Sequence, residues 1–137
     1  MFNTLVHIGV RATDLEKTIR FWRDGLGLEV VSKMKNGFDL SDGCHNFRVF
    51  QHDGLSRPKH VSGMLDYLHI GIRTNNLEEM AQRLMDMGYQ IFSDGLGGKV
   101  PLDINNLKEG AFKVEDPDGI TVDVTSSKDQ WPGVQLK

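Results

Sequence analysis

The sequence predicts an α+β fold built from two βαβββ repeats, and three observations support this prediction. The chain resembles itself after a shift of 62 residues, each copy begins with an alternating strand followed by a capped amphipathic helix, and each copy ends in strands joined by an Asp-Gly turn. The 137 residues, 39% of them hydrophobic and 26% charged, have the size and composition of one folded domain. We expect a repeat at 4–52, a connector at 53–66, a second repeat at 67–126 and a tail at 127–137.

The repeat is clearest in the segments Val6–Ile19 and Leu68–Ala81. The identical pairs are His7/His69, Ile8/Ile70, Gly9/Gly71, Arg11/Arg73, Leu15/Leu77 and Glu16/Glu78. Two unrelated amphipathic segments would share apolar positions, but not His, Gly and Arg in register, so we interpret the match as a duplication. Beyond the helix the match continues with one residue fewer, since Gly27 then aligns with Gly88.

In the first repeat, Leu5–Arg11 alternates between apolar and polar residues, which predicts a strand. The capping box Thr13-x-x-Glu16 predicts a helix start, and Gly25 and Gly27 predict its end. The strands predicted to follow are Leu28–Lys35, Phe38–Leu40 and Asn46–Gln51, the last two joined by the turn Asp42-Gly43.

The second repeat follows the same plan, with Leu68, Ile70 and Ile72 on the core face of its first strand and a helix cap at Asn75-x-x-Glu78. Its later strands are predicted at Tyr89–Ser93, Ala111–Glu115 and Ile120–Thr125. The segment Asp94–Gly110 has no counterpart in the first repeat. We interpret it as a long loop that acts as a lid over a site.

The candidate functional residues lie on the strand faces that point away from the helices, because strand side chains alternate between the two faces. These residues are His7, Arg48, Phe50, His69, Thr121 and Asp123. If the two repeats pair about a pseudo-two-fold axis, the polar groups converge in one cleft. We expect Arg48, Phe50 and Thr121 to contact a substrate there.

Three stretches, Val6–Val10, Leu68–Ile72 and Phe112–Val124 with its Asp-Pro-Asp-Gly turn, resemble the vicinal oxygen chelate superfamily, which includes glyoxalase I, extradiol dioxygenases and bleomycin-resistance proteins. The resemblance runs from about Leu5 to Thr125. It implies two paired units that form a half-open, cup-shaped mixed β-barrel with the helices outside, around a divalent metal. The ligand positions of the family fall on His7, His69 and Asp123.

Two positions depart from the family pattern. Asp123 is one methylene shorter than the usual glutamate, and the position of a common fourth ligand holds Arg48, whose guanidinium cannot coordinate a metal. Two histidines and one carboxylate form the facial triad typical of non-heme Fe(II). Fe(II) is therefore the favoured cofactor, with Zn, Mn or Ni as alternatives. Arg48 then has a catalytic role, since a guanidinium binds carboxylate or enolate oxygens well.

The resemblance implies a metalloenzyme acting on a small oxygenated substrate, with ring-cleaving-dioxygenase-type chemistry favoured over glyoxalase-type chemistry. An alternative remains open: a metal-free, non-catalytic protein that binds a small molecule, as drug-resistance relatives do. In that interpretation Asp123 pairs with Arg48 and the histidines are satisfied by local hydrogen bonds.

Composition excludes several other classes of function. A net charge of −3 without a basic tract argues against nucleic-acid binding. No apolar run approaches the roughly 18–20 residues of a membrane span. The single cysteine, Cys44, excludes an intramolecular disulfide and predicts a reducing, cytoplasmic setting. Exposed sheet edges and Trp131 in a polar tail lead us to expect a homodimer.

Overall fold

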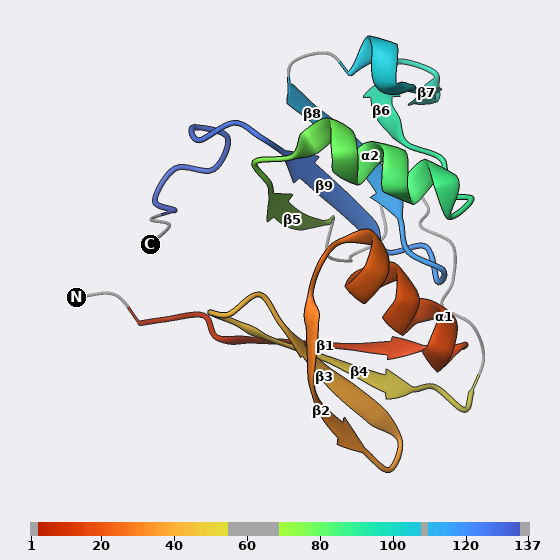
Figure 1. Ribbon diagram of the computed structural model, residues 1–137, viewed down its shortest axis with the longest axis vertical. Helices are drawn as coiled ribbons and strands as arrows, with labels where there is room; N and C mark the ends of the chain where they lie inside the picture. The colour runs from red at the N-terminus through yellow and green to blue at the C-terminus, as the bar shows by residue number, and fades with distance from the viewer. Residues whose placement is uncertain (1–2, 55–68, 108–109, 135–137) are drawn as a thin grey trace. The chain divides into compact units, whose positions relative to one another are not determined.

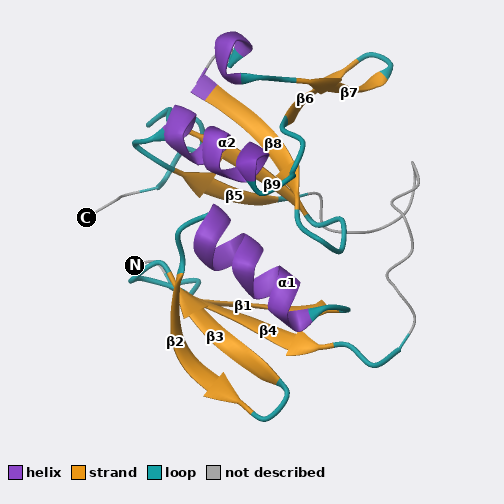
Figure 2. Ribbon diagram, turned by 45° about the vertical axis from the view of Figure 1, so that its right-hand side comes forward, coloured by secondary structure: helices purple, strands orange, loops and turns teal. Residues whose placement is uncertain are grey.

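The computed structural model describes residues 3–54, 69–107 and 110–134 (Figure 1). The chain divides into two compact units, one comprising residues 1–65 with 116–119 and the other residues 66–115 with 120–137. Each unit contains one sheet and one principal helix that lies across a face of that sheet (Figures 1 and 2). The predicted α+β class and the two repeats are confirmed. Most of the predicted connector, from residue 55 to residue 66, lies outside the described residues.

The first unit holds a four-stranded sheet in the order β1-β4-β3-β2. Its elements are β1 (His7–Ala12), α1 (Leu15–Arg20), a π-helical turn η1 (Phe21–Gly25), β2 (Glu29–Met34), β3 (Gly37–Ser41) and β4 (Asn46–Gln51). β1 runs parallel to β4, while β4, β3 and β2 are antiparallel neighbours. The helix therefore connects two strands that are not adjacent in the sheet.

The second unit repeats this topology with one extra strand, in the order β5-β9-β8-β6-β7. Its elements are β5 (Ile70–Arg73), α2 (Leu77–Asp86), β6 (Phe92–Gly95), β7 (Gly98–Pro101), a 3-10 turn η2 (Ile104–Asn106), β8 (Ala111–Glu115) and β9 (Thr121–Thr125). The prediction of a long loop over Asp94–Gly110 is wrong in its first part. β6 and β7 form a tight hairpin there, with Gly95 paired to Gly98.

Both helices begin one residue later than the capping boxes predict. The N-cap of α1 is Asp14, whose carboxylate accepts a hydrogen bond from the backbone N–H of Lys17 at 3.0 Å. The N-cap of α2 is Asn76. Thr13 has another role, because its hydroxyl and backbone N–H both donate to Asp118. Because the Thr13 hydroxyl is bound to Asp118, it does not cap the helix. Asp14, the next residue with a side-chain acceptor, takes the N-cap position instead.

The two cores differ in kind. In the first unit Trp22 is fully buried, with its ring centroid 4.2 Å from that of Phe47 and 5.5 Å from that of Phe21. The second unit has a mainly aliphatic core, in which the fully buried residues include Leu84, Ile91, Val114, Val122 and Val124. Ile70 and Ile72, predicted as core residues of β5, are only half-buried. Leu68 lies outside the described residues.

The turn between β8 and β9 groups with the first unit rather than with the strands that it joins. Asp116 accepts a hydrogen bond from the buried indole N–H of Trp22 at 3.4 Å, and Asp118 accepts the two bonds from Thr13. Gly119 closes the turn with a φ of +82°, a conformation that glycine adopts without strain. The Asp-Pro-Asp-Gly sequence thus has a structural role.

No helix in the described part of the chain is long and apolar enough to cross a membrane.

Candidate functional site

The polar face of the first sheet is built by strict alternation on β4. Phe47 and Val49 are buried, whereas Asn46, Arg48 and Phe50 point to the other face and are more exposed. The parallel register of β1 and β4 pairs His7 with Asn46, Gly9 with Arg48, and Arg11 with Phe50. The face predicted to carry functional groups therefore exists in the first unit.

The His7 side chain is held by its register partner. Its Nδ1 lies 2.5 Å from Oδ1 of Asn46, so Nδ1–H donates to the amide oxygen and the lone pair of Nε2 is left for another interaction. Metal-binding histidines are oriented in this way by a second hydrogen bond through their other ring nitrogen. The bond to Asn46 therefore fixes the orientation of the His7 ring.

Arg48 is held by Asp39 on the neighbouring strand β3. The Nε and Nη2 atoms donate to the two carboxylate oxygens at 2.7 and 2.8 Å, and the two residues are directly opposed in the β3–β4 register. The hydrogen bond from Arg48 lowers the pKa of Asp39 to about 2. Asp39 was not predicted from the sequence, although its place between Phe38 and Leu40 puts it on the polar face.

The second sheet carries a corresponding cluster. Nε2 of His69 lies 3.7 Å from Oδ2 of Asp123, and Nζ of Lys113 lies 2.9 Å from the same oxygen. Asp123 is buried on β9, and Lys113 opposes it on β8. The predicted neighbours His69 and Asp123 are thus brought together within one unit. Lys113 was missed, although the pattern of Phe112, Lys113 and Val114 places it on the polar face.

Arg48 and Asp123, which form an ion pair in the sequence-based alternative, each have an ion-pair partner within their own unit. Arg48 pairs with Asp39 and Asp123 pairs with Lys113. Each charge is balanced inside its own unit by the residue across the strand.

The two further residues predicted to contact substrate lie on the same polar faces. The ring of Phe50 is about one-third exposed, with Cζ of Arg48 5.7 Å from its centroid. Thr121 is half-buried at the start of β9, opposite Glu115.

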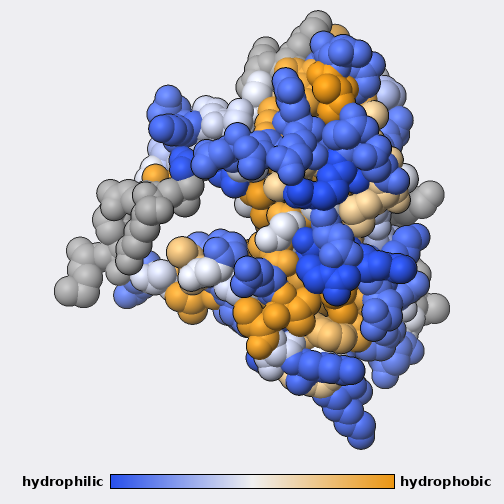
Figure 3. All heavy atoms as spheres, viewed as in Figure 1, coloured by the Kyte–Doolittle hydropathy of each residue, from blue (hydrophilic) through white to orange (hydrophobic). Residues whose placement is uncertain are grey.

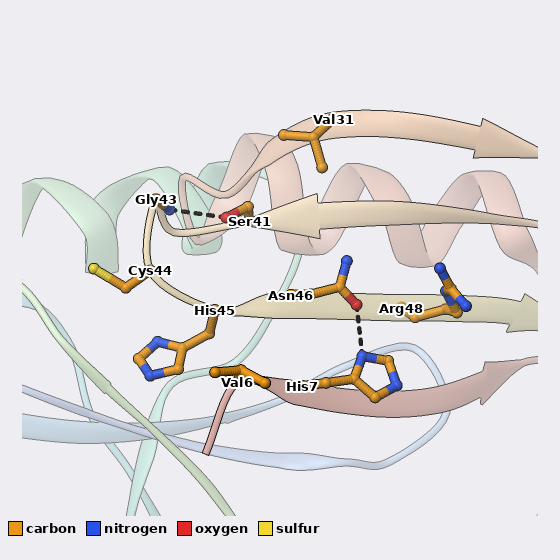
Figure 4. A pocket seen from close by; sticks show the side chains of 9 residues that line it. All are labelled: Val6, His7, Val31, Ser41, Gly43, Cys44, His45, Asn46 and Arg48. Carbon is orange, nitrogen blue, oxygen red and sulfur yellow. Dashed lines mark hydrogen bonds between the residues drawn. The ribbon is translucent and has the colours of Figure 1, made fainter. Parts of the chain in front are cut away.

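An open pocket of about 610 Å³ lies on the polar face of the first unit (Figure 4). It is lined by Val6, His7, Val31, Ser41, Gly43, Cys44, His45, Asn46 and Arg48. Val6 and Val31 are both more than half exposed, and apolar side chains also reach the surface over the strands of this unit (Figure 3). The pocket therefore has an apolar side chain at each edge of the sheet, Val6 next to β1 and Val31 on β2, and contains the His7–Asn46 pair.

In the second unit, the indole of Trp131 covers the corresponding glycine of β5. A Cβ atom built on Gly71 would lie 2.8 Å from the indole atoms Cη2 and Cζ2. Gly71 pairs with Asp123 in the parallel register of β5 and β9. Only glycine accommodates this approach of the tail to the strand that follows His69.

The donor set fits a divalent cation in its chemistry, with two imidazoles and one carboxylate. His69 and Asp123 lie side by side in the second unit, and His7 is oriented in the first. Among the residues described within either unit by itself, no three His, Cys, Asp or Glu side chains form a ligand group. The predicted ligand set therefore draws on both units, and the site that it would form remains a prediction.

Comparison with known families gives one match that spans most of the chain. The family model of the glyoxalase/bleomycin resistance protein/dioxygenase superfamily matches residues 4–124. The glutathione transferase FosA of Serratia marcescens is 28% identical over 122 residues, covering 87% of this chain and 77% of FosA.

Solved structures show the same fold at low sequence identity. The trypanothione-dependent glyoxalase I of Leishmania major superposes with a TM-score of 0.67 at 20% identity, covering 90% of this chain and 86% of that enzyme. The fosfomycin resistance protein FosX of Listeria monocytogenes superposes with a TM-score of 0.67 at 15% identity, covering 95% of this chain and 98% of FosX.

Proposed function

Because the chain belongs to the glyoxalase/bleomycin resistance protein/dioxygenase superfamily, we propose that it is an enzyme that binds a small oxygenated substrate at a divalent metal held by His7, His69 and Asp123. The observation that supports this most directly is the placement of His69 Nε2 3.7 Å from Asp123 Oδ2. The orientation of His7 by Asn46 adds a third donor with a free ring nitrogen.

A bound divalent metal would supply Lewis-acid stabilisation of an enolate- or catecholate-like oxygen. The other residues bind and orient. Asn46 fixes the imidazole of His7, and Asp39 fixes the guanidinium of Arg48 so that its planar face is held at the polar surface. Arg48 is the proposed catalytic group, because a guanidinium in this position stabilises negative charge on a substrate oxygen. Phe50 and Thr121 would contact the rest of the substrate.

The metal and the reaction are narrower proposals. Two histidines and one carboxylate favour Fe(II) over Zn, Mn or Ni, and Fe(II) favours ring-cleaving-dioxygenase-type chemistry over glyoxalase-type chemistry. The similarity to FosA adds glutathione transfer as a third chemistry to assay. A homodimer and a cytoplasmic setting also remain predictions.

One observation favours a second candidate, a metal-free protein that binds a small molecule. Lys113 already neutralises Asp123 at 2.9 Å, so the carboxylate has a cationic partner without any metal. In this alternative, the pocket beside His7 would hold a ligand through Arg48 and the apolar side chains of Val6 and Val31.

Metal uptake separates the two candidates. We expect the wild type, freed of metal and then supplied with Fe(II), Zn(II), Mn(II) or Ni(II), to bind one equivalent by elemental analysis, and we expect His69→Ala to lose most of it. His69 is partly exposed, so the variant keeps its fold and its unfolding midpoint. The matched control is His45→Ala, which removes an exposed histidine that pairs with Asp42 and leaves uptake unchanged. A wild type that binds no more metal than His69→Ala would establish the metal-free alternative.

A further inference from the structure

The carboxylate of Asp123 has two nitrogen neighbours, and both approach the same oxygen. Lys113 donates a hydrogen bond to Oδ2 at 2.9 Å, while His69 Nε2 lies 3.7 Å from Oδ2. The side chains of Lys113 and Asp123 are 16% and 11% exposed, so this pair is largely shielded from water. Within the described residues, no hydrogen bond reaches Oδ1. The oxygen best placed to join His69 in binding a cation is therefore the one already bound to an ammonium.

The equivalent pair in the first unit is more firmly fixed. Arg48 binds both oxygens of Asp39 through two nitrogens, whereas Lys113 binds one oxygen of Asp123 through one. A guanidinium in a two-bond pair has a rigid geometry, while a lysine ammonium is a point charge on a flexible stem that can turn to another partner. The next acid within reach of Lys113 is Asp94, whose Oδ2 lies 3.8 Å from Nζ and whose side chain is 77% exposed.

We propose that Lys113 is an exchangeable counter-cation of Asp123. It neutralises the carboxylate in the metal-free protein, and a divalent metal displaces it. This inference rests on the proposed function. Two cations at the same oxygen repel each other, so a metal bound at Oδ2 would weaken the Lys113–Asp123 bond, and the ammonium in turn would weaken metal binding.

The displaced ammonium then has a second role. It stays on the same face of β8 and β9, where the exposed Asp94 is its remaining acidic neighbour among the described residues. A solvated carboxylate at this distance holds an ammonium weakly. Lys113 is therefore available to bind an anionic oxygen of the substrate, such as a carboxylate, phosphonate or enolate oxygen. The order of binding is metal first and anionic substrate second.

The first test measures metal affinity by calorimetric titration of the metal-free protein with Co(II). Lys113→Met should bind Co(II) about tenfold more tightly than the wild type, or better, because the carboxylate is no longer neutralised. Lys113→Arg should bind it more weakly, because a guanidinium holds both oxygens. The matched control is Lys99→Met, which removes the same charge from the exposed pair with Glu115 and should change the affinity by less than about twofold.

The second test uses inorganic phosphate as an anionic probe of the Co(II)-loaded protein, followed by the change in the Co(II) absorption spectrum. Phosphate should bind Lys113→Met about tenfold more weakly than the wild type, and Lys99→Met as the wild type. Unfolding midpoints of all variants, measured with and without Co(II), show whether each has kept its fold.

The outcomes are distinct. If the wild type binds Co(II) and Lys113→Met binds it no more tightly, or if Lys99→Met tightens it equally, the exchange at Asp123 is refuted while the metal site stands. If Lys113→Met tightens Co(II) binding but leaves phosphate affinity unchanged, the anion-binding role is refuted. If no variant and no wild-type protein binds Co(II), the proposed metal site and this inference fail together.

Discussion

The polar faces of the two units have the same backbone layout, and each carries one basic and one acidic residue, in reversed order across the strands. In the first unit the strand register aligns Gly9, Arg48 and Asp39 across β1, β4 and β3. In the second it aligns Gly71, Asp123 and Lys113 across β5, β9 and β8. Base and acid have exchanged places, so the residue that pairs with the edge-strand glycine is an arginine in one unit and an aspartate in the other.

This difference shows that the duplicated backbone determines which positions lie side by side, while the residue types at those positions can vary. The pleat and register determine that two side chains meet across adjacent strands on this face. The residue types then determine the chemistry of each face: Arg48 pairs with Asp39 on the first, and Asp123 lies beside Lys113 and His69 on the second.

The largest expected effect is the loss of stability when a core side chain is truncated, and it is compared between the two units. Trp22→Ala should lower the free energy of unfolding by about 3–5 kcal/mol, because it leaves a cavity beside Phe47 and removes the donor to Asp116. Urea unfolding followed by circular dichroism measures it. The control in the second unit is Leu84→Ala, with an expected loss of about 2–5 kcal/mol and no broken hydrogen bond to the β8–β9 turn. A loss below about 1 kcal/mol for Trp22→Ala would contradict the buried aromatic core.

The next effect isolates the ion pair of the first unit. The pKa of Asp39 is lowered from 3.8 to about 2, chiefly by its hydrogen bond from Arg48. A carboxyl with a lowered folded-state pKa stabilises the protein above its unfolded pKa, and this stabilisation is lost as the pH falls from about 4 to about 2. Asp39→Asn should therefore lower the urea midpoint at neutral pH and match the wild type near pH 2.

The control for this pH profile is Asp129→Asn, which removes a carboxylate from an exposed position in the tail. We expect it to follow the wild type across the whole range. A difference between Asp39→Asn and the wild type that persists undiminished at about pH 2 would mean that the carboxylate does not stabilise the fold through its charge.

The smallest effect compares the two strand glycines. An alanine at Gly71 meets the indole of Trp131 at 2.8 Å, whereas an alanine at Gly9 meets only the His7 ring, at an ordinary 3.5 Å. Gly9→Ala should raise the free energy of unfolding by about 0.4–1 kcal/mol through the unfolded chain. Gly71→Ala should raise the free energy of unfolding by less than Gly9→Ala does. It should also shift the Trp131 fluorescence emission to the red, because the indole is displaced. Trp22, fully buried, provides a constant background. Equal stability and unchanged spectra for both variants would refute the contact.

Much of this layout was accessible from the sequence because it follows from alternation. The bounds of β4 and β8 were predicted without error, and the polar placement of Arg48 and of Asp123 followed from the same pattern. The ion-pair partners Asp39 and Lys113 were not predicted, although they lie on strands β3 and β8, whose alternation is equally clear.

Other features depend on contacts that no local pattern encodes. Thr13 and Asp14 both suit an N-cap, and the choice of Asp14 follows from the bonds between Thr13 and Asp118, which are distant in sequence. The β6–β7 hairpin is short and rich in glycine, so its strands carry little periodic signal. The half-buried position of Ile70 depends on the tertiary packing around β5, which the alternation of the strand does not encode.

The π-helical turn at Phe21–Gly25 explains the one-residue difference in length between the repeats. His7 and His69 are 62 positions apart, but Gly27 and Gly88 are 61 apart, so the first copy has one more residue between these landmarks. The backbone N–H of Leu26 donates to the carbonyl of Phe21 at 3.1 Å, a bond that spans one residue more than an α-helical bond. An insertion into a regular helix would rotate every later side chain by about 100°. The π-helical turn accommodates the extra residue locally. The two copies therefore differ in length here, while the strand that follows keeps the same faces toward the core and toward the polar side.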